Sequence, residues 1–346
     1  MTDGETSFIS IGDPSEKEIF GLRGPFHLNN VDWSKPDDKR AIAASLVEGV
    51  YILERDRQHE RRRNQALAPI WWKFFHFKCI EEIKDIHDGS IIGAIFKYNH
   101  HEHIGVPPKY VIAFRGTLLK WPTIGRDIYS DFKVALNLIT ESTRYETFLV
   151  AVQRVIDQVS PEDVWLAGHS LGASIALQVG KAMARKKCPI KTYLFNRPYV
   201  SLPLEKINNE GFRFAAHRAG YVATKILTDA HSTDSSDPHG ELRSWFPYMF
   251  VNRNDPICRE YIGYFEQREK MESMGLENLA NIGSRKPLIG LLFDAKSDRE
   301  ALHLVPSAYL VQNLLPMDED DLKGAHTLQQ WWAPHTQWQT RRFQFH

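Results

Sequence analysis

The chain has 346 residues, and its 43 Lys plus Arg balance 43 Asp plus Glu, so its formal net charge is zero at pH 7. Without an excess of either charge, the chain as a whole is drawn neither to nucleic acid nor to an anionic membrane. Its three cysteines are odd in number and lack Cys-x-x-Cys spacing, so they predict neither a closed disulfide framework nor a thiolate metal site. The length is compatible with one large domain that carries insertions.

The first residues and the lack of long apolar runs bear on cellular location. Residues 1–18 are acidic and polar, whereas a secretory leader needs a basic start followed by an apolar run. No run approaches the roughly 20 consecutive apolar residues of a membrane-spanning helix. Because cysteines are also scarce, we expect a cytoplasmic protein with no transmembrane segment.

The chain begins with a segment that has no periodic pattern. Residues 1–30 mix Gly, Pro, Ser and acids, so we expect a loosely ordered lead-in there and a single domain over residues 31–346. A helix is predicted from Asp37, where apolar residues follow at helical spacing. The charged run 54–63 at its end is typical of a solvated face, rather than of an anion-binding patch.

Two strands are predicted at 91–98 and 110–114, with a histidine-rich loop between them. The loop contains His100, His101, Glu102 and His103, which are residue types that bind metals. Neighbouring side chains on one short loop rarely converge on one ion without distant partners. We therefore predict an exposed loop and no metal site.

The centre of the chain alternates strands and helices. The predicted elements are a helix over 143–159, a strand over 163–167, a helix over 173–184, and strands over 191–195 and 245–252. Strand, helix, strand in this order is the unit of a parallel sheet, so we predict an α/β fold whose mostly parallel central sheet is flanked by helices. Charged, Gly-interrupted residues 266–300 are predicted to form an insertion, followed by a last strand within 302–315 and a short helix at 325–332.

The strongest chemical motif is Gly-x-Ser-x-Gly, at Gly168, Ser170 and Gly172, between a predicted strand and a predicted helix. A serine on a sharp strand-to-helix turn is a nucleophile in strained geometry, and the positions two before and two after it must be small. The helix that follows points its first N–H groups at the reaction centre, so Leu171 is predicted to donate to the oxyanion. The alternative is a structural turn in a Rossmann-like unit.

Two stretches of the sequence resemble the class 3 lipases and their plant relatives, which have an α/β-hydrolase fold. They are Val111 to Thr117, which ends in Phe-Arg-Gly-Thr, and Ala167 to Ala173, with its Gly-His-Ser-Leu-Gly core. A looser match runs through Tyr193 to Pro198, where the family usually has a Phe-Gly-x-Pro turn and this chain has Asn196 in place of the glycine. Ala173 likewise departs from a second consecutive glycine.

The resemblance implies that Thr117 provides the second oxyanion donor. The residues agree, because an acyl-transfer site needs two donors and the end of a neighbouring strand can supply one. The loop 118–126 falls where the family carries a lid, so it either makes transient contact with a lipid surface or packs on the protein.

The acid and the base of a serine hydrolase with this fold are expected after the nucleophile, in the order Ser, Asp, His. Asp255 ends a predicted strand, whereas Asp229, Asp234 and Asp237 lie in a polar loop. The stretch 251–256 also looks like the family's acid-bearing segment. Apart from catalysis, Asp255 before Pro256 could simply form a turn.

Two histidines after Asp255 compete for the role of base. His303 lies among aliphatic residues in a predicted strand, where a core histidine is more common. His326 follows an acidic loop and a glycine, and looks like the family's late histidine. We favour His326, because a base must reach the nucleophile from a loop.

The sequence thus predicts a serine carboxylic-ester hydrolase that acts on a small-molecule or lipid ester through Ser170, Asp255 and His326. No metal or organic cofactor is implied, and no nucleic-acid partner. Alternatives are a catalytically silent scaffold with this fold, or an acyltransferase that uses the same triad. A Gly-Asp-Ser-Leu hydrolase is disfavoured, because the nearest string at 12–15 contains a proline.

Overall fold

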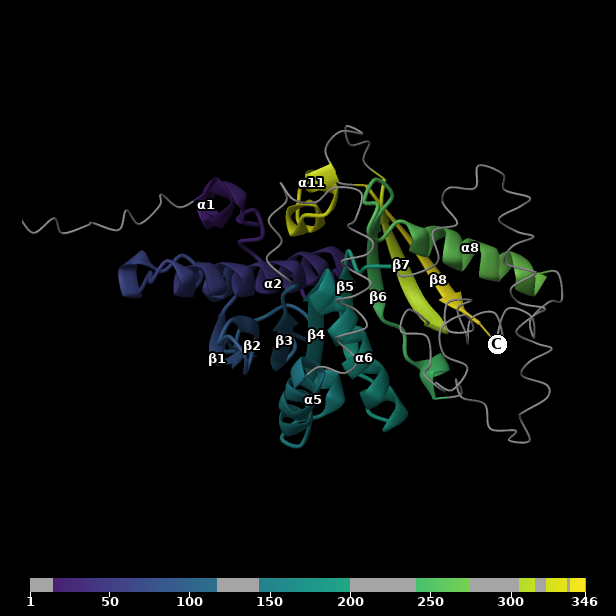
Figure 1. The fold of residues 1–346 in the computed structure, drawn as a ribbon, viewed down its shortest axis with the longest axis horizontal. Coiled ribbons are helices and arrows are strands. Elements are labelled where there is room, and N and C mark those ends of the chain that lie inside the picture. Colours follow the sequence, from purple (N-terminus) through teal and green to yellow (C-terminus); the bar gives the residue numbers. More distant parts are fainter. Residues whose placement is uncertain are drawn as a thin grey trace, which may run out of the picture.

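One eight-stranded sheet organises the protein, and its strands lie side by side in chain order (Figure 1). The computed structural model describes residues 15–116, 143–199, 241–273, 305–314, 322–334 and 337–345. The strands are β1 (Phe77–Lys84), β2 (Ile91–Tyr98), β3 (Tyr110–Phe114), β4 (Val164–His169), β5 (Lys191–Phe195), β6 (Tyr248–Asn252), β7 (Ser307–Asn313) and β8 (Trp338–Gln344). Strands β3 to β7 are parallel, the pairings β1–β2, β2–β3 and β7–β8 are antiparallel, and β1 and β8 are the edge strands.

The strand order determines which face the connecting helices cover. Parallel strands that follow one another in order, joined by right-handed crossovers, place all their connections on one face of the sheet. Helices α5 (Thr143–Ile156), α6 (Leu171–Arg185) and α8 (Glu260–Ser273) lie between successive strands and pack into one shared cluster on that face. In α5 the buried residues are Phe148, Ala151, Val152 and Val155, which form one helical stripe.

The connections between the parallel strands leave the opposite face of the sheet uncovered. Helix α2 (Pro36–Gln58) packs against that face. Figure 1 shows α2 on one side of the sheet, with α5 and α6 on the other. Helix α2 contacts β2, β3, β4 and β5, and its apolar face joins a second core cluster. The short helices η1 (Glu16–Glu18), α1 (Phe20–Arg23), α3 (Ile70–Lys73) and η7 (Leu328–Trp331) also lie on this side, through residues such as Phe20, Trp71 and Trp331.

The side chains of β4 alternate between the two cores because both faces of the sheet are covered. Val164 and Leu166 belong to the α5–α6 side, whereas Trp165 and Ala167 belong to the α2 side. All six residues of β4 are buried. This continuous apolar run is typical of a central parallel strand, and it brings the chain to Ser170 at the carboxyl edge of the sheet.

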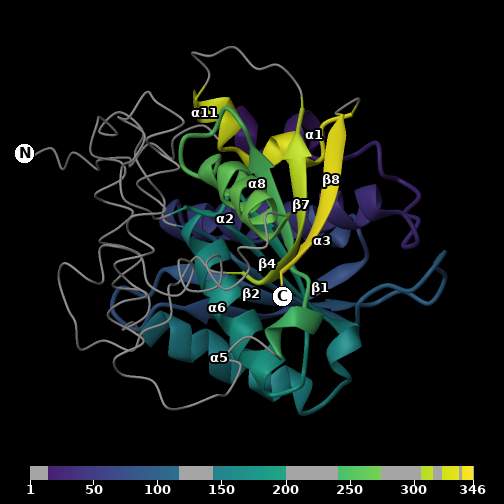
Figure 2. The same cartoon turned by 90° about the vertical axis from the view of Figure 1, so that its right-hand side faces the viewer.

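The structure describes parts of the expected lead-in and of the expected insertion. Within the expected lead-in 1–30, η1 and α1 are helical, and the Phe20 ring packs edge-on against Trp71 at a centroid distance of 5.1 Å. Within the expected insertion 266–300, residues 266–273 continue α8, which lies beside β7 and β8 in Figure 2. Residues 274–300 lie outside the described part. The short helix expected at 325–332 is divided between α11 (Leu322–Ala325) and η7.

Within the described ranges, no helix combines the length and the apolar composition that crossing a membrane demands.

Candidate active site

Ser170 occupies a sharp turn between β4 and α6. Its φ of 53° and ψ of −127° are unusual for a residue with a side chain, and α6 begins at the next residue, Leu171. The backbone N–H of Ser170 donates to the carbonyl of Phe195 at 2.9 Å, which fixes the turn to β5. The strand, strained serine and helix that the motif predicted are therefore all present.

The glycines on either side of Ser170 leave no room for a side chain. A Cβ on Gly168 would lie 2.6 Å from the carbonyl oxygen of Gly172 and 2.8 Å from Ala173 Cα. A Cβ on Gly172 would lie 2.5 Å from the carbonyl oxygen of Phe114, at the end of β3. These contacts are with backbone atoms, which cannot swing aside, so close approach of three chain segments requires glycine at both positions.

Gly172→Ala is expected to lower the free energy of unfolding by about 1–3 kcal/mol, the usual range for overpacking, because backbone atoms must shift. Urea unfolding measures the change. The matched control is Gly263→Ala in α8, where no atom lies within 4 Å of the new Cβ and alanine is the better helix former. Equal stability of the two variants would contradict the close approach at Gly172.

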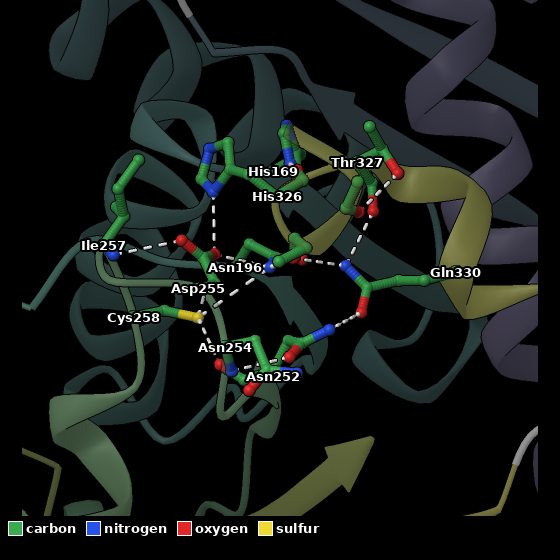
Figure 3. Close-up of polar contacts among 12 residues, drawn as sticks. His169, Asn196, Asn252, Asn254, Asp255, Ile257, Cys258, His326, Thr327 and Gln330 are labelled. Atoms are coloured by element: carbon green, nitrogen blue, oxygen red, sulfur yellow. Dashed lines mark hydrogen bonds and ion pairs between the residues drawn. The ribbon is translucent and has the colours of Figure 1, made fainter. Parts of the chain in front are cut away.

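Asp255 is fully buried in the turn after β6, and donors surround its carboxylate. Oδ2 accepts hydrogen bonds from His326 Nδ1 at 2.8 Å, Asn196 Nδ2 at 2.7 Å and Cys258 Sγ at 3.1 Å (Figure 3). Oδ1 accepts from the backbone N–H of Ile257 at 3.0 Å. Burial acts to raise the pKa of Asp255, but the charge and hydrogen bond of His326 and the other donors outweigh it and lower the pKa below its usual value.

Cys258 serves this carboxylate as a neutral donor. Burial and the neighbouring charge of Asp255 raise the pKa of the Cys258 thiol well above its ordinary value. The thiol therefore keeps its proton and can donate it in the contact with Asp255.

His326 lies just after α11, in the connection to η7, and is buried. A carboxylate has no proton to donate, so the 2.8 Å contact with Asp255 requires a proton on His326 Nδ1. In the neutral ring this leaves Nε2 as the proton acceptor. The ring centroid of His326 lies 4.9 Å from that of His169, the residue before Ser170, so the contact between Asp255 and His326 lies beside the turn.

His169 connects this pair to the other side of the site. Its Nε2 lies 2.8 Å from the carbonyl oxygen of His326, and its Nδ1 lies 2.9 Å from the Tyr51 hydroxyl. That hydroxyl also accepts the N–H of Gly116 at 2.7 Å. The carbonyl can only accept, so His169 donates from Nε2 and receives the Tyr51 proton at Nδ1. A neutral histidine thus links α2, the end of β3 and the His326 loop.

The stability of the protein is expected to fall with acid because of His169. Burial and the proximity of His326 lower the pKa of His169 to about 3, from the ordinary 6.5. Between these values the unfolded chain binds a proton that the folded chain does not. The contribution of His169 is therefore complete above pH 6.5, and it is lost as the pH falls towards 3, by at most about 1.4 kcal/mol per pH unit.

Urea unfolding between pH 7 and pH 5 measures this slope, and His169→Gln is expected to flatten it. The comparison is made within each variant, so a lower overall stability of His169→Gln does not affect it. Identical slopes in the two proteins would show that His169 is not kept neutral by the fold.

The remaining predicted residues fall into two groups. Leu171 is the first residue of α6, so no preceding turn of the helix offers a carbonyl group to accept its N–H. Thr117, His303 and the loop 118–126 lie outside the described residues. Tyr51, Asn196 and Cys258 were not predicted from the sequence. Of these, only Asn196 had a local signal, because it stands where the family usually has glycine.

The chain was matched to a family model, to a curated relative and to a solved structure. The model of the family lipase (class 3) matches residues 111–212. An Arabidopsis thaliana protein named as a GDSL esterase/lipase is 38% identical over 351 residues, which cover 96% of this chain and 99% of that protein. The crystal structure of a lipase from Rhizopus microsporus var. chinensis is similar over 67% of this chain and 70% of that chain, at 14% identity and a TM-score of 0.34.

Proposed function

Because the chain belongs to the class 3 lipase family and is a lipase-like hydrolase, we propose that Ser170, His326 and Asp255 form a catalytic triad that cleaves carboxylic esters. The observation that supports this most directly is the buried contact between Asp255 and His326, which lies beside the strained turn at Ser170. A buried carboxylate and imidazole at the carboxyl edge of the sheet have the chemistry that a serine nucleophile requires.

In the first half of the proposed reaction, Ser170 Oγ attacks the ester carbonyl carbon while His326 Nε2 takes the hydroxyl proton. Asp255 stabilises the imidazolium that results. The negative charge that develops on the carbonyl oxygen is stabilised by the N–H groups of Leu171 and Thr117. Collapse of this intermediate breaks the ester C–O bond, and the alcohol leaves with the proton from His326, so that Ser170 carries the acyl group.

In the second half, His326 removes a proton from water as the water oxygen attacks the acyl carbon. The carboxylic acid is released, and Ser170 recovers its proton.

No step of the proposed reaction requires a metal or an organic cofactor. The family indicates lipid esters as the substrate class. All three cysteines are free thiols, which supports the proposal of a reducing, cytoplasmic location.

The function is tested with nitrophenyl esters of increasing acyl length and with a fluorophosphonate probe, which labels only an activated serine. Hydrolysis together with labelling at Ser170 supports the proposal, whereas a folded protein with neither would favour the scaffold alternative. Adding a competing alcohol and identifying the products separates hydrolysis from acyl transfer. Predominant transfer to the alcohol over water would replace the hydrolase assignment with the acyltransferase one.

A further inference from the structure

Asn196 follows β5 in a backbone conformation that glycine adopts at least cost. Its φ is 46°, in the left-handed region, where asparagine is tolerated and most other side chains are strained. The side chain is fully buried. A buried amide must have its donors and its acceptor satisfied, so its contacts indicate what the side chain does there.

Each polar atom of the Asn196 side chain has a defined partner. Nδ2 donates to Asp255 Oδ2 at 2.7 Å and to the carbonyl oxygen of Ala325 at 2.9 Å. Oδ1 accepts the indole N–H of Trp331 at 2.6 Å. Asp255 and the Ala325 carbonyl can only accept and Trp331 can only donate, so all three contacts favour the same orientation of the amide. The close-up in Figure 3 shows Asn196 between Asp255 and the segment that carries His326.

Two of these partners belong to the two halves of the acid–base pair. Asp255 Oδ2 is the oxygen that also accepts from His326 Nδ1. Ala325 is the residue before His326, so its carbonyl oxygen belongs to the peptide group that leads into the base. One amide group thus holds the acid and the backbone of the base at the same time.

We propose that Asn196 is a positioning residue that keeps the Asp255 carboxylate charged and aligned with His326. This inference rests on the proposed function of the triad. The amide donor stabilises the charged form of Asp255 and restricts rotation of the carboxylate, so that Oδ2 faces Nδ1. The same amide limits movement of the loop at Ala325.

The experiment compares Asn196→Gly, Asn196→Asp and Trp331→Phe with the wild type and with Ser170→Ala. Asn196→Gly keeps the backbone conformation and removes the amide. It is expected to lower kcat by about tenfold to a hundredfold, the range for a hydrogen bond to a charged group, with KM within about twofold. The alignment acts on the transition state, so kcat changes and KM does not.

Asn196→Asp gives a readout that a purely structural role would not produce. The substitution is nearly isosteric and tolerates the positive φ, but places a second carboxyl group against Asp255. At low pH the introduced carboxyl is protonated and can still donate to Oδ2. At higher pH it loses that proton and repels Asp255. We therefore expect the ratio of variant to wild-type kcat/KM to fall as the pH rises.

Trp331→Phe is the control for structural damage. It removes the donor to Asn196 Oδ1 and leaves the amide contacts with Asp255 and Ala325. A lower Tm is expected, with kcat and the pH profile of the wild type. All variants are compared by thermal unfolding, and if Asn196→Gly does not fold, the nearly isosteric Asn196→Asp carries the test.

The outcomes separate this inference from the proposed function. If Ser170→Ala is inactive while both Asn196 variants keep the wild-type kcat and pH profile, Asn196 has no positioning role and the triad stands. If Trp331→Phe lowers kcat as much as Asn196→Gly does, the effect is structural and the inference is wrong. If Ser170→Ala is fully active, the proposed function itself fails.

Discussion

Ser170→Ala is expected to lower kcat by a factor on the order of 10⁶, because removing the nucleophile of a complete triad leaves only binding and oxyanion stabilisation. The substitution keeps the Cβ of residue 170, which packs closely against Gly116. A Cβ added to Gly116 would lie only 3.0 Å from it. The strained φ of 53° is as demanding for alanine as for serine. The loss of activity should therefore occur without unfolding.

Ser174→Ala, one turn further along α6, is the matched control. Ser174 is also buried and also loses only a hydroxyl oxygen, but it lies within the helix rather than at the turn. It should keep its activity and its labelling by a fluorophosphonate. Full hydrolysis by Ser170→Ala would mean that the ester is cleaved elsewhere.

The sequence predicted the interior of the sheet well, because interior strands are short apolar runs bounded by turn residues. Strands β2, β3 and β5 have the residue bounds that the pattern indicated. Strands β2 and β3, predicted as neighbours joined by the histidine-rich loop, pair antiparallel. These strands are buried on both faces, so burial itself selects their composition.

The first edge strand, β1, was missed because its buried side carries few apolar residues. Burial alternates along the whole strand, but only Phe77 and Ile83 are buried, and the half-buried positions between them hold Cys79 and Glu81. Ile80, at the register shift between Cys79 and Glu81, lies on the other side and is 46% exposed. The strand therefore lacks the regular exchange of apolar and polar residues by which a half-buried strand is recognised in a sequence.

The other edge strand, β8, was missed because it is polar. Its Arg341 contacts Glu266 and Glu269 of α8, at 3.4 and 2.6 Å, and Arg342 lies over the ring of Phe246. Charged residues protect an exposed strand edge from pairing with other chains. The same property removes the apolar alternation by which a strand is recognised.

The residues of the candidate site also differ in whether the neighbouring sequence or only distant contacts mark them. A local motif marks Ser170, and the end of a strand marks Asp255, so neighbouring residues were enough to propose both. Tyr51 and Asn196 act through contacts with segments more than 50 residues away, such as the 2.9 Å contact of Tyr51 with His169. In the sequence Tyr51 is one more residue of a helix stripe, and only the packing of α2 against the sheet reveals its role.

His326→Ala is expected to cost about as much kcat as the loss of Ser170, on the order of 10⁶, because the nucleophile and its base act as one unit. The buried contact of His326 Nδ1 with Asp255 supports its choice over His303. Removing the ring also takes a donor from a buried carboxylate, so part of the effect could be structural. His326→Asn addresses this, because its amide can still donate to Asp255 but cannot accept the serine proton.

His303→Ala provides the opposing measurement. If His303 is a core residue, its loss lowers the stability and largely preserves kcat, while both His326 variants are inactive and no longer react with a fluorophosphonate. Loss of labelling is the sharper readout, since the probe reports activation of Ser170 and does not depend on how an ester substrate binds. An inactive, folded His303→Ala beside an active His326→Asn would transfer the role of base to His303, and the contact between Asp255 and His326 would then serve only to satisfy a buried carboxylate.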